Sequence, residues 1–265
     1  MLLSRITTGD LPVTPSADDP VRNQLRIWKT LGFGFLEKYE VKAQSASAPA
    51  EASTPAPPPA ATFDAKPSLA LEDRVTALQA IATEVAGCEK CRLCHGRTNT
   101  VPGEGDPMAE LMFIGEGPGF NEDQQGRPFV GKAGDLLTKI IEAMQFKRSE
   151  VFIGNVVKCR PPQNRQPEPD EMETCLPYLH RQIEILQPKA IVLLGRTALM
   201  GLMPDLRDKS MTAARGRWLD FHGISVMPTY HPAYLLRNAS AKRLVWEDMK
   251  QVMAFFGRTP PGKGG

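Results

Sequence analysis

The chain has 265 residues, a formal net charge of +2 and five cysteines. Its length suits one domain with an appendage, because single hydrophobic cores seldom grow past about 250 to 300 residues. No stretch is long and apolar enough for a membrane span and no signal peptide is evident, so we expect no membrane association and a cytoplasmic location. In that setting five cysteines predict metal ligation or reactive thiols rather than a disulfide framework. The small charge permits nucleic-acid binding without requiring it.

Composition divides the chain into four segments. Residues 1–42 form an extension in which 21–36 can make one amphipathic helix. One such helix cannot fold alone, so it docks on a protein partner or on the main domain, or stays loosely structured. Alanine, proline and serine dominate residues 43–68, which predicts a disordered linker. The folded domain is expected at 69–257, followed by a flexible tail at 258–265.

Beyond the linker, helical and strand patterns alternate. A helix is predicted from Leu69 to about Ala86, with an apolar face of Leu71, Val75, Leu78, Ile81 and Val85. Four apolar runs are typical of buried parallel strands, at Leu111–Ile114, Val151–Val157, Ala190–Leu194 and Ile224–Pro228. Further helices are predicted near 134–146, 170–187, 196–203 and 242–256. This alternation predicts an α/β fold, a three-layer α/β/α sandwich around a central four-stranded parallel sheet.

The segment Gly115–Gly134 follows the first predicted strand and holds six glycines. It leaves the carboxyl end of a strand, the edge where open α/β sheets bind ligands. A plain glycine linker would not carry a carboxylate such as Glu116 or an aromatic such as Phe129. The G-x-G-x-G spacing also departs from the dinucleotide fingerprint, and no helix is expected to start directly after it. We therefore interpret the segment as an active-site loop.

The cysteines form two distant groups. Cys88 and Cys91 make a C-x-x-C pair, whereas Cys159 and Cys175 lie far along the chain. Together they can supply a tetrahedral set for zinc or for an iron-sulfur cluster, and the wide second spacing favours a cluster. Alternatively, Cys94 extends the first pair to a ferredoxin-like C-x-x-C-x-x-C run, or the thiols are unrelated. Spacing alone does not choose the spare cysteine.

Four motifs now coincide with a known pattern: Gly115–Gly119 (GEGPG), Gly126–Gly134 (GRPFVGKAG), Asn155–Arg165 (NVVKCRPPQNR) and His231–Arg237 (HPAYLLR). Over about residues 69–257 the chain resembles the family 4, iron-sulfur type of uracil-DNA glycosylase. The resemblance implies the glycosylase fold, uracil-containing DNA as substrate and a 4Fe-4S cofactor. It also implies a ligand set of Cys88, Cys91, Cys159 and Cys175, which leaves Cys94 spare.

Cleaving the bond between uracil and deoxyribose develops a cationic sugar and an anionic base. Glu116 is our candidate for the carboxylate that positions water and stabilises the cation. His231 is the candidate donor to uracil O2. Phe129 would stack on the flipped base, and the amide of Asn155 would read its edge. The alternatives are a solvated Glu116, a core Phe129, a turn-capping Asn155 and a structural His231.

The remaining site predictions are less specific. The backbone of Gly117, Pro118 and Gly119 would line the pocket and supply N–H donors. By resemblance, Glu122 lines the pocket near the uracil 5-position, and Asn164 helps to orient water. The DNA-binding candidates are Lys132 and Arg237 for phosphates and Leu235 and Leu236 for a wedge that fills the gap of the flipped base.

Departures from related patterns limit the mechanism. Glycosylases without a cluster carry an aspartate where this chain has Gly117, so hydrolysis would depend on Glu116 and His231. Residues 207–218 lack the histidine of a branch that is trapped covalently on DNA, which favours turnover. We expect a monomeric hydrolase of N-glycosyl bonds acting in DNA repair. The competing hypotheses are a noncatalytic iron-sulfur module that binds DNA or a polymerase, and an electron carrier.

Overall fold

The computed structural model describes residues 69–260 of the chain. The extension at 1–42, the linker at 43–68 and the last residues of the tail, 261–265, lie outside the described residues, and so do the predictions made for them. No helix among the described residues is long and apolar enough to cross a membrane.

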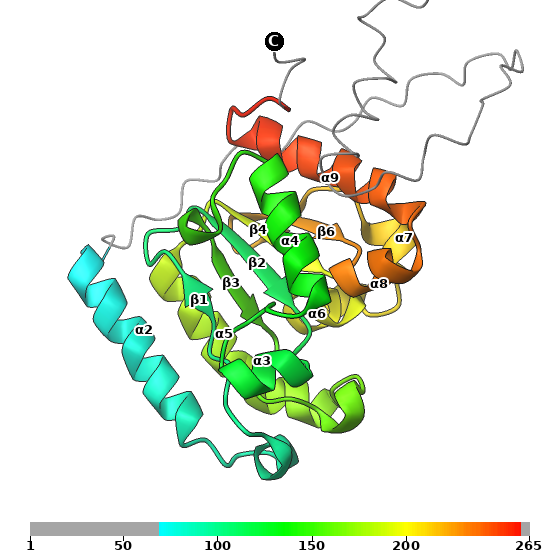
Figure 1. Ribbon diagram of the computed structural model, residues 1–265. Coiled ribbons are helices and arrows are strands. Elements are labelled where there is room, and N and C mark those ends of the chain that lie inside the picture. The colour runs from blue at the N-terminus through cyan, green and yellow to red at the C-terminus, as the bar shows by residue number, and fades with distance from the viewer. Residues whose placement is uncertain (1–68, 261–265) are drawn as a thin grey trace, which may run out of the picture. The chain divides into compact units, whose positions relative to one another are not determined.

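A six-stranded sheet with the order β1-β3-β2-β4-β6-β5 forms the centre of the fold (Figure 1). Its strands are β1 (Glu104–Gly105), β2 (Leu111–Gly115), β3 (Phe152–Asn155), β4 (Ala190–Leu194), β5 (Leu219–Phe221) and β6 (Ile224–Thr229). The four central strands are parallel, as predicted, whereas β1 and β5 pair antiparallel with β3 and β6 at the two edges. The prediction of four strands therefore missed both edges of the sheet.

The α-helices are α2 (Leu71–Ala86), α3 (Phe120–Gln125), α4 (Lys132–Ala143), α5 (Pro169–Leu186), α6 (Arg196–Leu202), α7 (Met211–Ala214), α8 (Pro232–Arg237) and α9 (Ala241–Phe255). Short 3₁₀ turns are η2 (Arg92–Gly96), η3 (Arg148–Glu150), η4 (Pro162–Asn164) and η5 (Pro204–Leu206). The long predicted helices are present. The short helices α3, α7 and α8 were not predicted.

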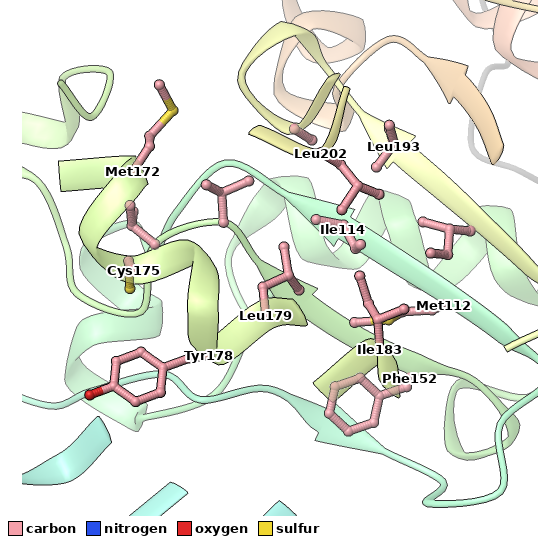
Figure 2. Packing of buried hydrophobic residues seen from close by; sticks show 14 of the residues in the cluster. Met112, Ile114, Phe152, Met172, Cys175, Tyr178, Leu179, Ile183, Leu193 and Leu202 are labelled. Carbon is pink, nitrogen blue, oxygen red and sulfur yellow. The ribbon is translucent and has the colours of Figure 1, made fainter. Parts of the chain in front are cut away.

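Both faces of the sheet are covered, which confirms the three-layer prediction. Every residue of β2 is buried, and a strand is buried on both sides only if helices lie above and below it. Figure 1 shows α4 and α9 on the near face of the sheet and α5 and α6 behind it. On the α5 side, Met112 and Ile114 of β2 join a cluster with Leu179 and Ile183 of α5 (Figure 2).

Helix α2 packs on α5, but only through part of its predicted apolar face. Ile81 and Val85 are buried, whereas Leu71 and Val75 are 51% and 48% exposed. Polar contacts hold the first turn instead, because the buried Arg74 donates to the carbonyl oxygen of Leu186 at the end of α5 (2.8 Å). The helix thus begins at the amino edge of the sheet and runs toward the edge where the site lies.

Candidate active site

The glycine loop begins where β2 ends and continues the pairing of β2 with β3 for two more residues. The amides of Val156 and Val157 donate to the carbonyl oxygens of Gly115 (3.0 Å) and Glu116 (3.1 Å). The loop then forms the six-residue helix α3 before α4 starts, so the expectation of no intervening helix was wrong. The buried Asp123 of α3 accepts the amide of Thr98 (2.8 Å) and therefore anchors the loop rather than facing a substrate.

Three predicted base-binding side chains lie close together at the carboxyl edge. Gly115 is paired with Asn155 in the sheet, and a Cβ on Gly115 would lie 2.5 Å both from Asn155 Oδ1 and from Phe129 Cζ. The ring of Phe129 stacks on His231 with ring centroids 5.5 Å apart and an interplanar angle of 29°. Glycine at position 115 therefore lets the three side chains approach one another.

Asn155 carries an unmatched acceptor. Its side chain is 1% exposed, and its Oδ1 is the buried side-chain oxygen left without a hydrogen-bond partner in the described part of the chain. A buried polar atom without a partner costs about 1–3 kcal/mol, so native proteins rarely leave one unless a ligand or water satisfies it. Asn155 therefore does not cap a turn through this oxygen. The amide is available to a ligand.

The backbone of Phe129 is held in an uncommon conformation. Its φ is +51°, in the left-handed region that a bulky residue seldom adopts. Glu122 fixes the following turn, because its Oε1 accepts the amides of Val130 (2.9 Å) and Gly131 (3.0 Å). The first turn of α4 presses on it as well, since a Cβ on Gly134 would lie 1.9 Å from the carbonyl oxygen of Phe129. The ring position is thus set by its surroundings.

His231 presents a defined ring nitrogen. Its Nδ1 accepts the amide of Ala233 at the start of α8 (3.0 Å), and an amide can only donate, so Nδ1 carries no proton. Burial lowers the pKa of His231 to about 4; Arg237 adds to the lowering and Glu122 opposes it. At neutral pH the ring is therefore neutral, with its proton on Nε2 as a donor.

Glu116 is half-buried and has a partner that sequence reasoning missed. The hydroxyl of Thr197 in α6 donates to Glu116 Oε2 at 2.5 Å. Burial raises the pKa of Glu116, and the Thr197 hydrogen bond opposes that rise. Thr197 lies in the turn after β4, which the predicted parallel sheet already placed on the same edge as Glu116. That position was the signal that could have identified it.

Two expected pocket residues have other contacts. Glu122 points one oxygen at backbone amides, and its Oε2 lies near Gly119, where a Cβ would be 2.7 Å away. Asn164 is exposed, and its Oδ1 accepts Arg160 Nε (2.7 Å), so in this conformation it is not aimed at a water in the pocket. Gly117 allows close packing on Val157, since a Cβ there would lie 2.6 Å from Val157 Cγ2. Between the two glycines, Pro118 is buried.

The DNA-binding candidates separate by exposure. Lys132 is exposed at the start of α4, and Arg237 is exposed at the end of α8. Leu236 is 49% exposed, but Leu235 is 1% exposed and belongs to the core. The prediction for Leu235 was wrong, because α8 packs this side chain into the core and leaves only Leu236 of the two leucines exposed to solvent.

All five cysteines line one small cavity, together with Arg97, Lys158 and Tyr178. The distant pair Cys159 and Cys175 thus meets the N-terminal group, as predicted. Donors point at the sulfurs: Arg97 Nη1 lies 3.3 Å from Cys159 Sγ, and the amide of Lys158 lies 3.3 Å from Cys175 Sγ. Among the described residues, no three His, Cys, Asp or Glu side chains converge closely enough to hold a single metal ion.

Lys158 connects the cavity lined by the cysteines to Asn155, one of the predicted base-binding residues. Its side chain is 1% exposed, and its Nζ donates to the carbonyl oxygen of Asn155 (2.9 Å) and to Gln182 Oε1 (2.7 Å). The buried ammonium group of Lys158 therefore holds the backbone of Asn155, the residue whose Oδ1 has no partner among the described residues. Gln182 is held in turn by the carbonyl oxygen of Pro102 (2.8 Å).

Comparison with known proteins gives consistent matches. The sequence pattern of the uracil DNA glycosylase superfamily matches residues 102–250. The type-4 uracil-DNA glycosylase of Sulfurisphaera tokodaii is 50% identical over 182 residues, which cover 66% of this chain and 83% of that protein. Those of Saccharolobus solfataricus and Thermotoga maritima are each 46% identical, over 190 and 182 residues. These alignments cover 69% and 68% of this chain and 88% and 94% of the relatives.

Proposed function

The chain belongs to the uracil DNA glycosylase superfamily and to its type-4 enzymes, and on that premise we propose that the pocket over Gly115 binds a uracil flipped out of DNA. The reaction is hydrolysis of the N-glycosidic bond, which releases uracil, leaves an abasic site and begins base excision repair. The base must leave the stack before any side chain can reach that bond.

The unmatched Oδ1 of Asn155 carries the proposal. Uracil has a hydrogen on N3 and a carbonyl at position 4, so one amide can accept from the first and donate to the second. Cytosine has an acceptor at N3, which would face Asn155 Oδ1 and leave both atoms unpaired. A buried mismatch of that kind costs several kcal/mol, because both groups lose their water. Phe129 supplies the stacking face.

His231 stabilises the leaving group. A neutral ring with its proton on Nε2 donates to uracil O2 and strengthens that hydrogen bond as negative charge develops. Donors of this type commonly contribute about 100- to 1,000-fold in rate. The neutral state of the ring results from burial and from the Ala233 amide, which donates to Nδ1. The Nε2 donor is therefore in place before the substrate arrives.

Glu116 serves the sugar. When ionised, its carboxylate stabilises the cationic deoxyribose, and the oxygen not held by Thr197 is available to orient the attacking water. Partial burial strengthens this charge interaction, because the local dielectric is lower than in water. Gly117 stands where glycosylases without a cluster carry an aspartate, so hydrolysis depends on Glu116 and His231 in this proposal.

Cys88, Cys91, Cys159 and Cys175 are the proposed ligands of a 4Fe-4S cluster, with Cys94 spare. Two observations support this ligand set: the four thiols line one cavity, and N–H donors point at two of them. Hydrogen bonds to ligand sulfurs also adjust the reduction potential of iron-sulfur clusters. A cluster is a larger body than an ion, so its ligands need not converge on one point. Its role is to join α2, the loop after β3 and α5. No step of hydrolysis passes through it.

The test is a base-release assay on uracil-containing oligonucleotides with wild type, Asn155→Ala, His231→Ala and Glu116→Gln. We expect wild type to release uracil with no added nicotinamide or metal, and each variant to be slower by about 100-fold or more. His180→Ala, which removes an exposed histidine of α5, is the matched control and should match wild type. If wild type releases no uracil from any DNA, the noncatalytic module is the better description.

A further inference from the structure

A large apolar side chain stands exposed next to the pocket. Phe120 is 55% exposed, the highest value for any large hydrophobic residue in the described part of the chain. It opens α3 directly after Gly119, and so belongs to the loop that carries Glu116. An exposed aromatic ring offers an apolar face on which a flat ligand group can stack.

Phe120 has an ordered cation over its ring. The guanidinium carbon of Arg160 lies 5.0 Å from the ring centroid. Arg160 follows β3 whereas Phe120 follows β2, so the pair bridges two loops at the same edge of the sheet. Both loops border Gly117, where a Cβ would lie 3.7 Å from the side chain of Pro161. The pair therefore lies on the two loops that meet at Gly117, one of which carries Glu116.

The loop after β3 is shaped to hold Arg160 in place. Asn164 Oδ1 accepts Arg160 Nε at 2.7 Å. Gln163 and Asn164 both have φ at +56°, in the left-handed region that costs non-glycine residues about 1 kcal/mol or more each. Asn164, which the sequence assigned to the attacking water, thus orients the guanidinium.

An exposed aromatic ring with a fixed arginine beside it is the chemistry that binds single-stranded nucleic acid. The ring stacks on a base of any sequence, and the arginine meets the phosphate. We propose that Phe120 and Arg160 form a stacking platform for the unpaired nucleotide next to the flipped uracil. In a duplex the neighbouring base is paired and stacked, so its face is not free and the platform contributes less. The platform rests on the proposed function, because it needs the damaged strand to lie over the pocket.

The platform is distinct from the expected wedge. Leu236, the exposed leucine of α8, belongs to an element that packs against α4, whereas Phe120 belongs to α3. Figure 1 shows α3 and α8 as separate helices. A wedge acts by filling a gap in a duplex, so Leu236 should matter most where Phe120 matters least. Strand preference is then the balance of the two contacts.

The test measures binding rather than cleavage. Fluorescence anisotropy would follow an oligonucleotide carrying a tetrahydrofuran abasic-site analogue, both single-stranded and in a duplex. We expect Phe120→Ala to weaken single-strand binding by roughly 5- to 100-fold, the range for loss of one stacked base, and duplex binding by about twofold at most. Phe120→Trp keeps a stacking face and should restore binding, whereas Phe120→Leu keeps the bulk alone and should not.

Arg160→Gln should weaken single-strand binding and reduce the slope of log affinity against log salt by about 0.7, the value for one phosphate contact. Leu71→Ala, which removes an equally exposed side chain from the start of α2, is the control and should leave both affinities unchanged. Equal losses on both DNA forms, or no loss in Phe120→Ala, would overturn the platform. If wild type releases uracil while Phe120→Ala binds normally, the platform alone fails and the proposed activity stands.

Discussion

The base pocket and the cysteine cavity lie at two ends of one short stretch of chain but treat their polar atoms in opposite ways. In the pocket, Asn155 Oδ1 has no hydrogen-bond partner among residues 69–260. In the cavity, Arg97 and the Lys158 amide point donors at Cys159 and Cys175. The proposed base pocket leaves a hydrogen-bond acceptor free for a ligand. The cysteine cavity instead points its hydrogen-bond donors at its own sulfur atoms. Substitutions in the two regions should therefore fail in different ways.

The largest expected effect belongs to the cavity. Cys175→Ser should abolish the visible absorbance (chromophore) of the proposed iron-sulfur cluster and reduce iron to near zero, because it removes a proposed ligand that is buried on α5, and thermal stability should fall with it. Cys94→Ser should keep full iron and sulfide content. Absorbance spectra with iron and sulfide analysis check both variants. If Cys94→Ser loses the chromophore while Cys175→Ser keeps it, the proposed ligand set is wrong.

An intermediate effect is expected from Gly115→Ala in the pocket. The backbone tolerates alanine there, but the added Cβ would lie 2.5 Å from both Asn155 Oδ1 and Phe129 Cζ. Overpacking of this kind costs about 1–3 kcal/mol, so kcat/KM for uracil release should fall by about 10-fold or more. Iron content should be unchanged, which separates the pocket from the cavity.

Gly87→Ala is the matched control, since a Cβ on Gly87 would have nothing within 4 Å and its φ is −90°. It should leave kcat/KM as in wild type. An active Gly115→Ala enzyme with normal kcat/KM would show that the pocket is looser than its packing indicates.

The smallest effect is a shift in pH dependence. In the proposed mechanism Glu116 acts in its ionised form, and the Thr197 hydrogen bond favours that form whereas burial disfavours it. Thr197→Val removes that bond, so the pKa of Glu116 rises further and the acid limb of the kcat/KM profile should move up by about one pH unit. His231, with a pKa of about 4, should titrate below this limb.

Thr197→Ser keeps the hydroxyl and should retain the wild-type limb. Rate measurements between pH 4 and 9 on the three proteins, with melting temperatures alongside, are sufficient. If Thr197→Val lowers the melting temperature but leaves the acid limb of the kcat/KM profile unchanged, Thr197 contributes packing alone and does not set the pKa of Glu116.

The sequence predicted those helices and strands that are long enough to show a pattern of apolar residues. The central strands are apolar runs bounded by loops, and the cysteine groups are brought together by the parallel order of those strands. Edge strands β1 and β5 contain two and three residues, too few to show alternation. Pairing with a neighbour creates such strands, and that pairing is not a local property of the sequence.

Individual roles depended on contacts that residue type does not reveal. Leu235 and Leu236 are identical in type, and only the packing of α8 decides which is buried. Glu122 was expected to line the pocket near the uracil 5-position, yet it holds the turn after Phe129, and its neighbour Asp123 anchors Thr98. Thr197 gave no signal as a residue type. Its position after β4 placed it on the same edge of the sheet as Glu116, and only the structure shows the hydrogen bond between the two side chains.

Lys158 links the packing of helix α5 to the placement of Asn155. Its amide contacts Cys175 and its ammonium contacts Gln182, and both partners belong to α5. The same lysine donates to the carbonyl oxygen of Asn155, so the amide proposed to read the base takes its place only when α5 has packed. On the proposed mechanism, a chain in which α5 has not packed would lack its means of recognising uracil.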